Sequence, residues 1–66
     1  MDANFKYLLG QRVQIISNGI FGFVEARIQH YNKGLLYDIT YKSTNGDHFT
    51  IEDVRQENIK AITKEI

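Results

Sequence analysis

Residues 28–51 of this 66-residue chain read IQHYNKGLLYDITYKSTNGDHFTI, and this stretch decides the fold. Apolar and polar residues alternate along it, which is typical of β-strands with one buried face. Two short polar segments that end in Gly34 and Gly46 interrupt the alternation, and a third such segment ends in Gly19. Glycine adopts the positive φ that tight hairpin turns require, so the pattern predicts antiparallel strands joined by hairpins.

Extending this pattern in both directions gives five strands and two short helical turns. The strands are expected at residues 11–16, 21–30, 35–42, 47–52 and 59–63. Residues 52–59 should form a tight helical turn that leads into the last strand. At the start of the chain, Asp2 can cap a helical turn over residues 3–9, which Gly10 would end.

The two central hairpins predict which residues lie opposite each other, because core-facing residues must oppose core-facing residues. The expected pairs are Ile28 with Tyr37, Ala26 with Ile39, Tyr41 with Phe49, and Ile39 with Ile51. On the outer face this register places Asp38 between Arg27 and Glu52. Two carboxylates beside a cation could hold a ligand amine or a metal ion, and the simpler interpretation is a row of surface charges.

The segment VQIISNGIFGFV, residues 13–24, resembles the opening of a KOW or Tudor-type barrel, in which a strand and a glycine turn lead into Gly-x-Val. Residues 54–59 resemble the short turn that closes such barrels. The resemblance covers about residues 10–63. It implies an all-β fold in one domain, residues 1–66. The expected architecture is a five-stranded SH3-like antiparallel barrel with a short N-terminal helical turn and a 3-10 turn before the last strand.

Known members of this class bind RNA, DNA, methylated peptides, proline-rich peptides or partner proteins. KOW modules that contact RNA are usually basic, whereas this chain has a net charge of zero. Tudor domains that read methylated side chains use an aromatic cage, whereas Tyr37 and Tyr41 are expected to face the core. A helix followed by a five-stranded barrel is also similar to Sm-like proteins, but their uridine-binding motifs are not recognisable in this sequence.

The composition narrows the function classes further. Cysteine is absent, which excludes disulfides and thiolate metal sites, and His30 and His48 lie in different expected strands. We therefore expect no metal and no cofactor, and we expect self-association to supplement so small a core. The balanced charge is unlike that of a dedicated duplex-DNA binder. We see no membrane-spanning segment or signal peptide, so we expect no membrane contact and a cytoplasmic location.

The sequence holds more large apolar residues than a barrel of this size can bury, which predicts a hydrophobic contact surface. The candidate partner-binding residues are Phe21, Phe23, Leu36, Ile16 and Ile20. The first interpretation is therefore a non-enzymatic protein–protein interaction module that binds another protein and forms a homo-oligomer. Its size is common among phage and mobile-element accessory proteins, whose partner would be a host or virion protein.

The alternative interpretation is nucleic-acid binding in the manner of KOW or Sm-like barrels. Basic and aromatic side chains together can pair with phosphates and stack on bases. The candidate residues are Arg12, Arg27, Lys33, Lys42 and Tyr31. We recognise no catalytic motif, so we do not expect an enzyme. A third interpretation, an active site assembled between subunits around a shared pore, requires a defined oligomer.

Overall fold

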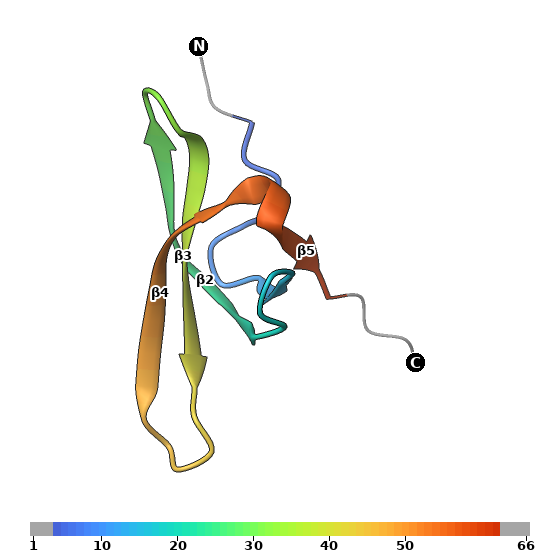
Figure 1. Cartoon of the computed structure of the whole chain (residues 1–66), viewed down its shortest axis with the longest axis vertical. Coiled ribbons are helices and arrows are strands. Elements are labelled where there is room, and N and C mark those ends of the chain that lie inside the picture. Colours follow the sequence, from blue (N-terminus) through green and yellow to red (C-terminus); the bar gives the residue numbers. More distant parts are fainter. Residues whose placement is uncertain (1–3, 63–66) are drawn as a thin grey trace.

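The structure is a computed structural model that describes residues 4–62 (Figure 1). It is all-β, with strands β1 (Arg12–Ile15), β2 (Phe21–His30), β3 (Gly34–Lys42), β4 (His48–Arg55) and β5 (Ile59–Ala61). A short 3-10 helix, η1 (Gln56–Asn58), joins β4 to β5. The five strands and a turn before the last one are confirmed, but the turn covers only residues 56–58, because β4 continues to Arg55 instead of ending at residue 52. Residue 63, the expected end of the last strand, lies outside the described residues. Between residues 4 and 62 we find no helix with the length and apolar character needed to cross a bilayer.

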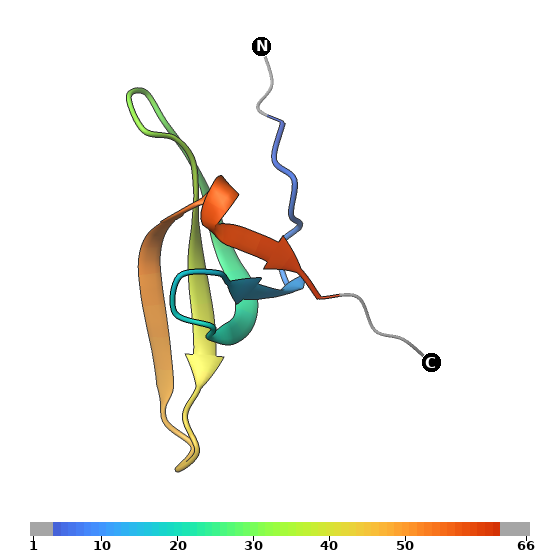
Figure 2. The same cartoon turned by 45° about the vertical axis from the view of Figure 1, so that its right-hand side comes forward.

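All five strands belong to one antiparallel sheet in the order β4-β3-β2-β1-β5. The first residues of β2 pair with β1, and most of β2 pairs with β3. The sheet is bent, so that β1 and β5 run across the long strands β2, β3 and β4 (Figure 2). Within residues 4–62, β4 and β5 are the two edges of the sheet and do not pair with each other. The closed barrel is therefore not confirmed.

The three glycines that predict the hairpin turns all adopt positive φ. Gly19, Gly34 and Gly46 have φ angles of 76°, 86° and 92°. A residue with a Cβ is strained in this region, so the turns depend on glycine at these positions. The turn prediction is confirmed.

The core lies between the two arms of the bent sheet, and each strand contributes to it. Its buried members are Tyr7, Val13, Ile15, Val24, Tyr37, Ile39, Val54 and Ile59. Phe5 and Ile51 pack against this cluster and are partly buried. The alternation that predicts Val13, Ile15 and Val24 as core residues is thus confirmed, because all three are at most 2% exposed.

The helical turn expected over residues 3–9 is not present in the described residues 4–9, and its Asp2 cap lies outside them. The backbone N–H groups of Lys6 and Tyr7 instead donate to the Tyr37 hydroxyl, at 3.0 and 3.3 Å. The Tyr7 hydroxyl donates to the Ile59 carbonyl at 2.8 Å. Burying one aromatic side chain and satisfying these groups outweighs the weak helical preference of so short a segment.

The predicted register is correct for β3 and β4 and wrong for β2 and β3. Tyr41 lies opposite Phe49, and Ile39 opposite Ile51, as expected. In β2, however, the register shifts between Val24 and Ala26. The shift makes Glu25 an extra residue, a β-bulge, which turns the rest of β2 over relative to the expected pairing.

The bulge removes the predicted charge row. Arg27 lies opposite Tyr37 rather than Asp38. Its guanidinium is 5.1 Å from the centroid of the Phe5 ring and donates to the Tyr7 carbonyl at 3.3 Å. The cation therefore stacks on the N-terminal segment instead of offsetting two carboxylates.

A second bulge lies in β4, and it involves Asp38 and Glu52, the two carboxylates of the predicted charge row. Ile51 and Val54 oppose Ile39 and Tyr37, so two residues of β4, residues 52 and 53, oppose one residue of β3. Asp53 has a φ of 59°, and its N–H donates to an Asp38 carboxylate oxygen at 3.1 Å. Asp38 thus stabilises the bulge rather than a ligand.

Candidate binding face

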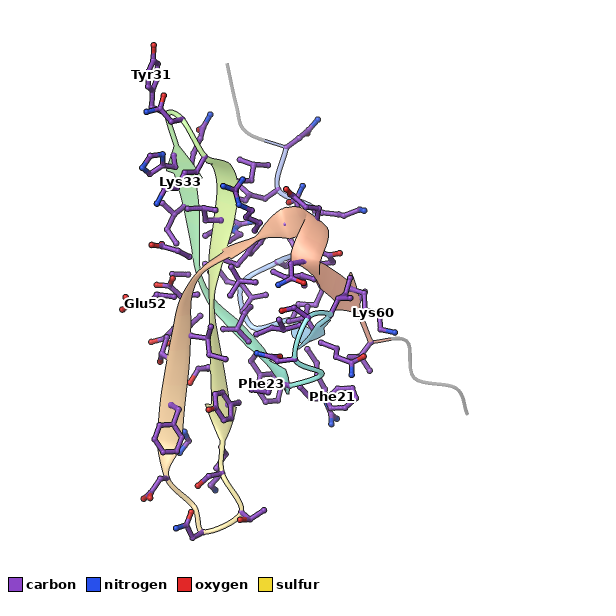
Figure 3. The ribbon with its side chains drawn as sticks, in the orientation of Figure 1. Phe21, Phe23, Tyr31, Lys33, Glu52 and Lys60 are labelled. Atoms are coloured by element: carbon purple, nitrogen blue, oxygen red, sulfur yellow. The ribbon has the colours of Figure 1, made fainter. Side chains whose placement is uncertain are left out.

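Two phenylalanines project side by side from the start of β2, away from the core (Figure 3). Phe21 is 51% exposed and Phe23 is 49% exposed. In β1, Gln14 lies opposite Phe21 and Arg12 opposite Phe23. Directly opposed residues on one face of an antiparallel pair have Cβ atoms only about 5 Å apart. The two rings therefore border a polar amide and a guanidinium.

The third strand of this surface is β5, where Lys60 lies opposite Gln14. Residues on one face of a sheet alternate along each strand, and the neighbours of these residues face the core. We call the outward side chains of these three strands the aromatic face. It consists of Arg12, Gln14, Phe21, Phe23 and Lys60.

The orientation of the two rings is fixed by the residues between and after them. Gly22 and Val24 are both buried. A Cβ on Gly22 would lie 2.5 Å from the Thr40 carbonyl oxygen and 2.7 Å from the Cγ2 of Ile39. β2 therefore lies directly against β3 at this point, and alternation along the strand sends Phe21 and Phe23 outward.

The turn beside the aromatic face is held by hydrogen bonds. The Gln14 side-chain amide donates to the Gly19 carbonyl at 3.1 Å. The N–H of Ile20 donates to the Asn18 side chain at 3.0 Å, and the N–H of Gly19 to the Ile15 carbonyl at 2.8 Å. The face thus lies on paired strands next to a closed turn, which preorganises it for contact.

Cations predominate around the two rings. Arg12 and Lys60 are two of these cations, and Lys42 is the third. Lys42 comes two residues after Thr40, which lies opposite Phe23, so Lys42 and Thr40 are on the same side of β3. The nearest carboxylate along β2 is that of Glu25, which accepts a hydrogen bond from the Thr50 hydroxyl at 3.1 Å. Three cations and one carboxylate therefore lie around the rings, so the local charge is positive although the whole chain is neutral.

The predicted partner-binding residues do not all reach this surface. Phe21 and Phe23 form its centre, while Ile16, 55% exposed, and the half-buried Ile20 lie in the adjoining turn. Leu36 is 1% exposed. The bulge places Ile28 opposite Leu36 in β2, and Arg55 is opposite it in β4, so neighbours flank Leu36 on both sides. It is unavailable to a partner.

The residues predicted for nucleic-acid binding are scattered. Arg12 belongs to the aromatic face and Lys42 lies near it, whereas Arg27 faces the N-terminal segment. Lys33 and Tyr31 lie at the far tip of the β2–β3 hairpin (Figure 3), where Tyr31 is 98% exposed. The structure therefore does not bring these five residues together.

Sequence reasoning missed Gln14 and Lys60 as site residues. Both are members of the face only because β1 lies between β2 and β5 in the sheet. The last strand was expected, but a single sequence does not say which strand it pairs with. The available signal was the outward position of each residue next to a core residue, Val13 or Ile59.

A hollow of about 440 Å³ lies on another side of the molecule, between the first turn and β4. Its polar lining residues include Ser17, Asn58, Glu52 and Asp53. Ser17 and Asn58 bond to each other twice, at 3.0 and 2.9 Å. Within residues 4–62 there is no group of three or more His, Cys, Asp or Glu side chains that could hold a metal ion. Ser17 and Asn58 thus satisfy each other, and the described lining residues bring together no set of metal ligands, so the hollow is a weaker candidate than the aromatic face.

Comparison with known proteins adds no relative from which a site could be transferred. The sequence matches no protein-family model, and neither the curated proteins nor the solved structures contain a match. A function for this chain therefore has to be inferred from the geometry of the aromatic face.

Proposed function

We propose that this chain is a small, non-enzymatic binding module whose contact surface is the aromatic face. The observation that carries the proposal is the outward, half-exposed pair Phe21 and Phe23, held by the buried Gly22 and Val24. Leaving half of a phenylalanine side chain in water forgoes about 1 to 2 kcal/mol per ring. Contact with a partner would recover much of this free energy, and aromatic side chains often dominate the energy of a contact.

Two kinds of partner follow from the sequence: another protein, including a second copy of this chain, or a nucleic acid. An accessory protein that binds a host or virion protein fits the first kind. Either partner would cover the same two rings. We therefore propose one contact surface, and which of the two kinds of partner binds to it is tested separately.

The test is affinity capture from an extract of the native host with the purified chain as bait. The variant Phe21→Ala/Phe23→Ala serves as the comparison bait, and both bound protein and bound nucleic acid are identified. We expect the wild type to retain a partner that the double variant loses. Equal retention by both baits would disprove the aromatic face as the contact surface.

A matched control separates loss of the surface from loss of the fold. Tyr31→Ala removes another exposed aromatic side chain, at the tip of the β2–β3 hairpin. This variant should capture the same partner as the wild type. Circular dichroism of all three baits should show the same β-sheet spectrum, because none of the altered side chains is buried in the core.

A further inference from the structure

We infer that the occupant of the aromatic face is a single-stranded nucleic acid, an inference that rests on the proposed function. Two unpaired bases would stack on Phe21 and Phe23, and the flanking phosphates would pair with Arg12 and Lys60. The spacing of the two rings and the charge around them support this inference.

The two rings form a stacking platform on a rigid support. Phe21 and Phe23 are two residues apart on one strand, so their Cα atoms are about 7 Å apart. The buried Gly22 between them presses β2 onto β3, which prevents the strand from rotating the rings inward. Aromatic side chains exposed on a sheet are how several single-strand-binding modules hold successive bases, and such stacking tolerates any base.

The charge around the rings is complementary to a phosphate backbone. Arg12 lies directly opposite Phe23, and Lys60 is one strand beyond Gln14. Lys42 adds a third cation on the neighbouring part of β3. Gln14 supplies an amide that could hydrogen-bond to a base edge or a sugar. Arginine can in addition stack its planar group on a base.

The same composition disfavours an apolar protein contact. With Leu36 buried, the apolar part of the face is the two rings, next to the exposed Ile16 of the adjoining turn, and cations and an amide border the rings. Stable protein interfaces usually bury about 800 Å² on each partner, with few charged residues and little lysine at the centre. The aromatic face places Arg12 and Lys60 beside its two rings and is therefore more basic than such a centre, so a protein partner is the competing outcome of the test.

The test is fluorescence anisotropy with labelled single-stranded oligo(dT) and oligo(U) of about 12 nucleotides. We expect Phe21→Ala and Phe23→Ala each to weaken binding about five- to a hundredfold, the range measured when a stacking ring is removed. We expect a duplex of the same length to bind at least about tenfold more weakly, because its bases are already stacked.

Salt dependence tests the electrostatic part of the inference. Three cations that contact a single strand should give a slope of about −2 in log affinity against log salt. Binding should therefore weaken about 20-fold between about 50 and about 200 mM salt. Arg12→Glu should weaken binding and make the slope shallower by about 0.7 or more.

The control variants lie at the β2–β3 hairpin tip, where Tyr31→Ala and Lys33→Glu repeat the same chemical changes away from the aromatic face. Both should bind oligonucleotides like the wild type. Loss of binding in these variants, with binding kept by Phe23→Ala, would place the site at the tip and overturn the inference.

The remaining outcomes distinguish the inference from the proposed function. If the wild type gives no anisotropy change at about 0.5 mM protein, above the usual range for unspecific binding, then the inference is wrong. A protein captured by the wild type and lost by Phe21→Ala/Phe23→Ala would then still support the aromatic face as a contact surface. If neither assay depends on the two rings, both the inference and the proposed function fail.

Discussion

The hydroxyl groups of Tyr37 and Tyr7 link the N-terminal segment to η1 and β5. The Tyr37 hydroxyl accepts the N–H groups of Lys6 and Tyr7 and bonds to the side chain of Gln56. Tyr7 in turn bonds to the backbone at Ile59, more than fifty positions later in the sequence. Buried polar groups of this kind are costly to leave unpaired, so each hydroxyl contributes to stability through the partners it satisfies.

Tyr37→Phe should lower the free energy of unfolding by about 1 to 3 kcal/mol, because it leaves the N–H of Tyr7 without its acceptor. Urea titration followed by circular dichroism measures the change. Tyr31→Phe makes the same chemical change at a residue that is 98% exposed, and it should have no measurable effect. Equal effects in the two variants would show that the Tyr37 hydroxyl is not structural.

Tyr7 should make the fold sensitive to alkali. Burial, and secondarily the nearby Tyr37, raises the pKa of Tyr7 above its ordinary value of 10.0. The folded state holds the phenolic proton of Tyr7 more tightly than the unfolded state does. The stability that the protonated Tyr7 contributes is therefore complete below about pH 10. It is lost as the pH rises through the folded-state pKa.

Thermal unfolding between about pH 8 and pH 11 tests this expectation. The midpoint temperature of the wild type should decrease once the pH exceeds about 10. Tyr7→Phe has no proton to lose, so its midpoint should fall less steeply, from a lower starting value because the bond to Ile59 is missing. Parallel curves for the two proteins would contradict the role of Tyr7.

At the scale of the elements, the two bulges decide where the surface lies. The bulge at Glu25 turns the second half of β2 over, which removes Arg27 from the outer face and covers Leu36 with Ile28. The bulge at Asp53 is held by the carboxylate of Asp38. Each inserts a single residue and changes which side chains a partner can contact.

Asp53→Val should destabilise the chain by about 1 to 2 kcal/mol, since a β-branched residue is strained at a φ of 59°. Chemical denaturation measures the difference. Glu52→Val is the matched control, because Glu52 is also exposed in the same bulge but does not have positive φ. A similar loss in both variants would indicate that the acidic charge, rather than the backbone conformation, is what matters.

Gly22→Ala should destabilise the fold by about 1 to 3 kcal/mol, since the added Cβ would collide with the Thr40 carbonyl and push β2 away from β3. The same displacement would tilt Phe21 and Phe23, so oligonucleotide affinity should fall as well. Denaturation and anisotropy on the same sample test both effects. An unchanged midpoint would show that β2 can move without cost.

How much of this could be predicted from the sequence depends on the element. The bounds of β2 and the turn glycines follow from alternation and from glycine chemistry. The bulge at Glu25 does not, because Val24, Ala26 and Ile28 still alternate and no glycine marks the extra residue. The N-terminal segment was misjudged for another reason: helical spacing in so few residues cannot compete with a place in the core.

The candidate site was predictable to a similar degree. Exposure of Phe21 and Phe23 followed from the surplus of apolar residues over core volume. Leu36 was expected at the contact surface but is buried, because its burial depends on a bulge that the sequence does not reveal. Lys60 was missed because the pairing of β5 with β1 is a long-range contact. Local patterns therefore located the rings but not their neighbours.

At the scale of the whole molecule, charge is separated although the total is zero. Arg12 and Lys60 lie on the aromatic face, whereas Glu52 and Asp53 lie at the bulge of β4, and Figure 3 shows Glu52 and Lys60 on opposite sides of the view. Phosphate attraction depends on local rather than net charge when the groups are farther apart than the screening length of about 8 Å. A neutral composition is therefore compatible with a phosphate-binding surface.

If the aromatic face holds a nucleic acid, as we infer, the free chain should be a monomer of 7.7 kDa by light scattering at micromolar concentration, in contrast to the homo-oligomer expected from its small core. A dimer that dissociates in Phe21→Ala/Phe23→Ala would identify a second copy as the partner instead. A dimer that the double variant retains would point to a different interface, and Leu9→Ala would then test the exposed N-terminal leucines.

The close approach of Gly22 to β3 has a practical consequence for engineering. Positions 12, 14, 21 and 23 form a two-by-two grid whose inward neighbours, Val13 and Gly22, are fixed by packing. Side chains at positions 12, 21 and 23 can be randomised without touching the interior, whereas Gln14 also holds the adjoining turn through its bond to the Gly19 carbonyl. Because the fold contains no disulfide that could be reduced, the chain offers a compact scaffold for selecting new affinity reagents in reducing compartments.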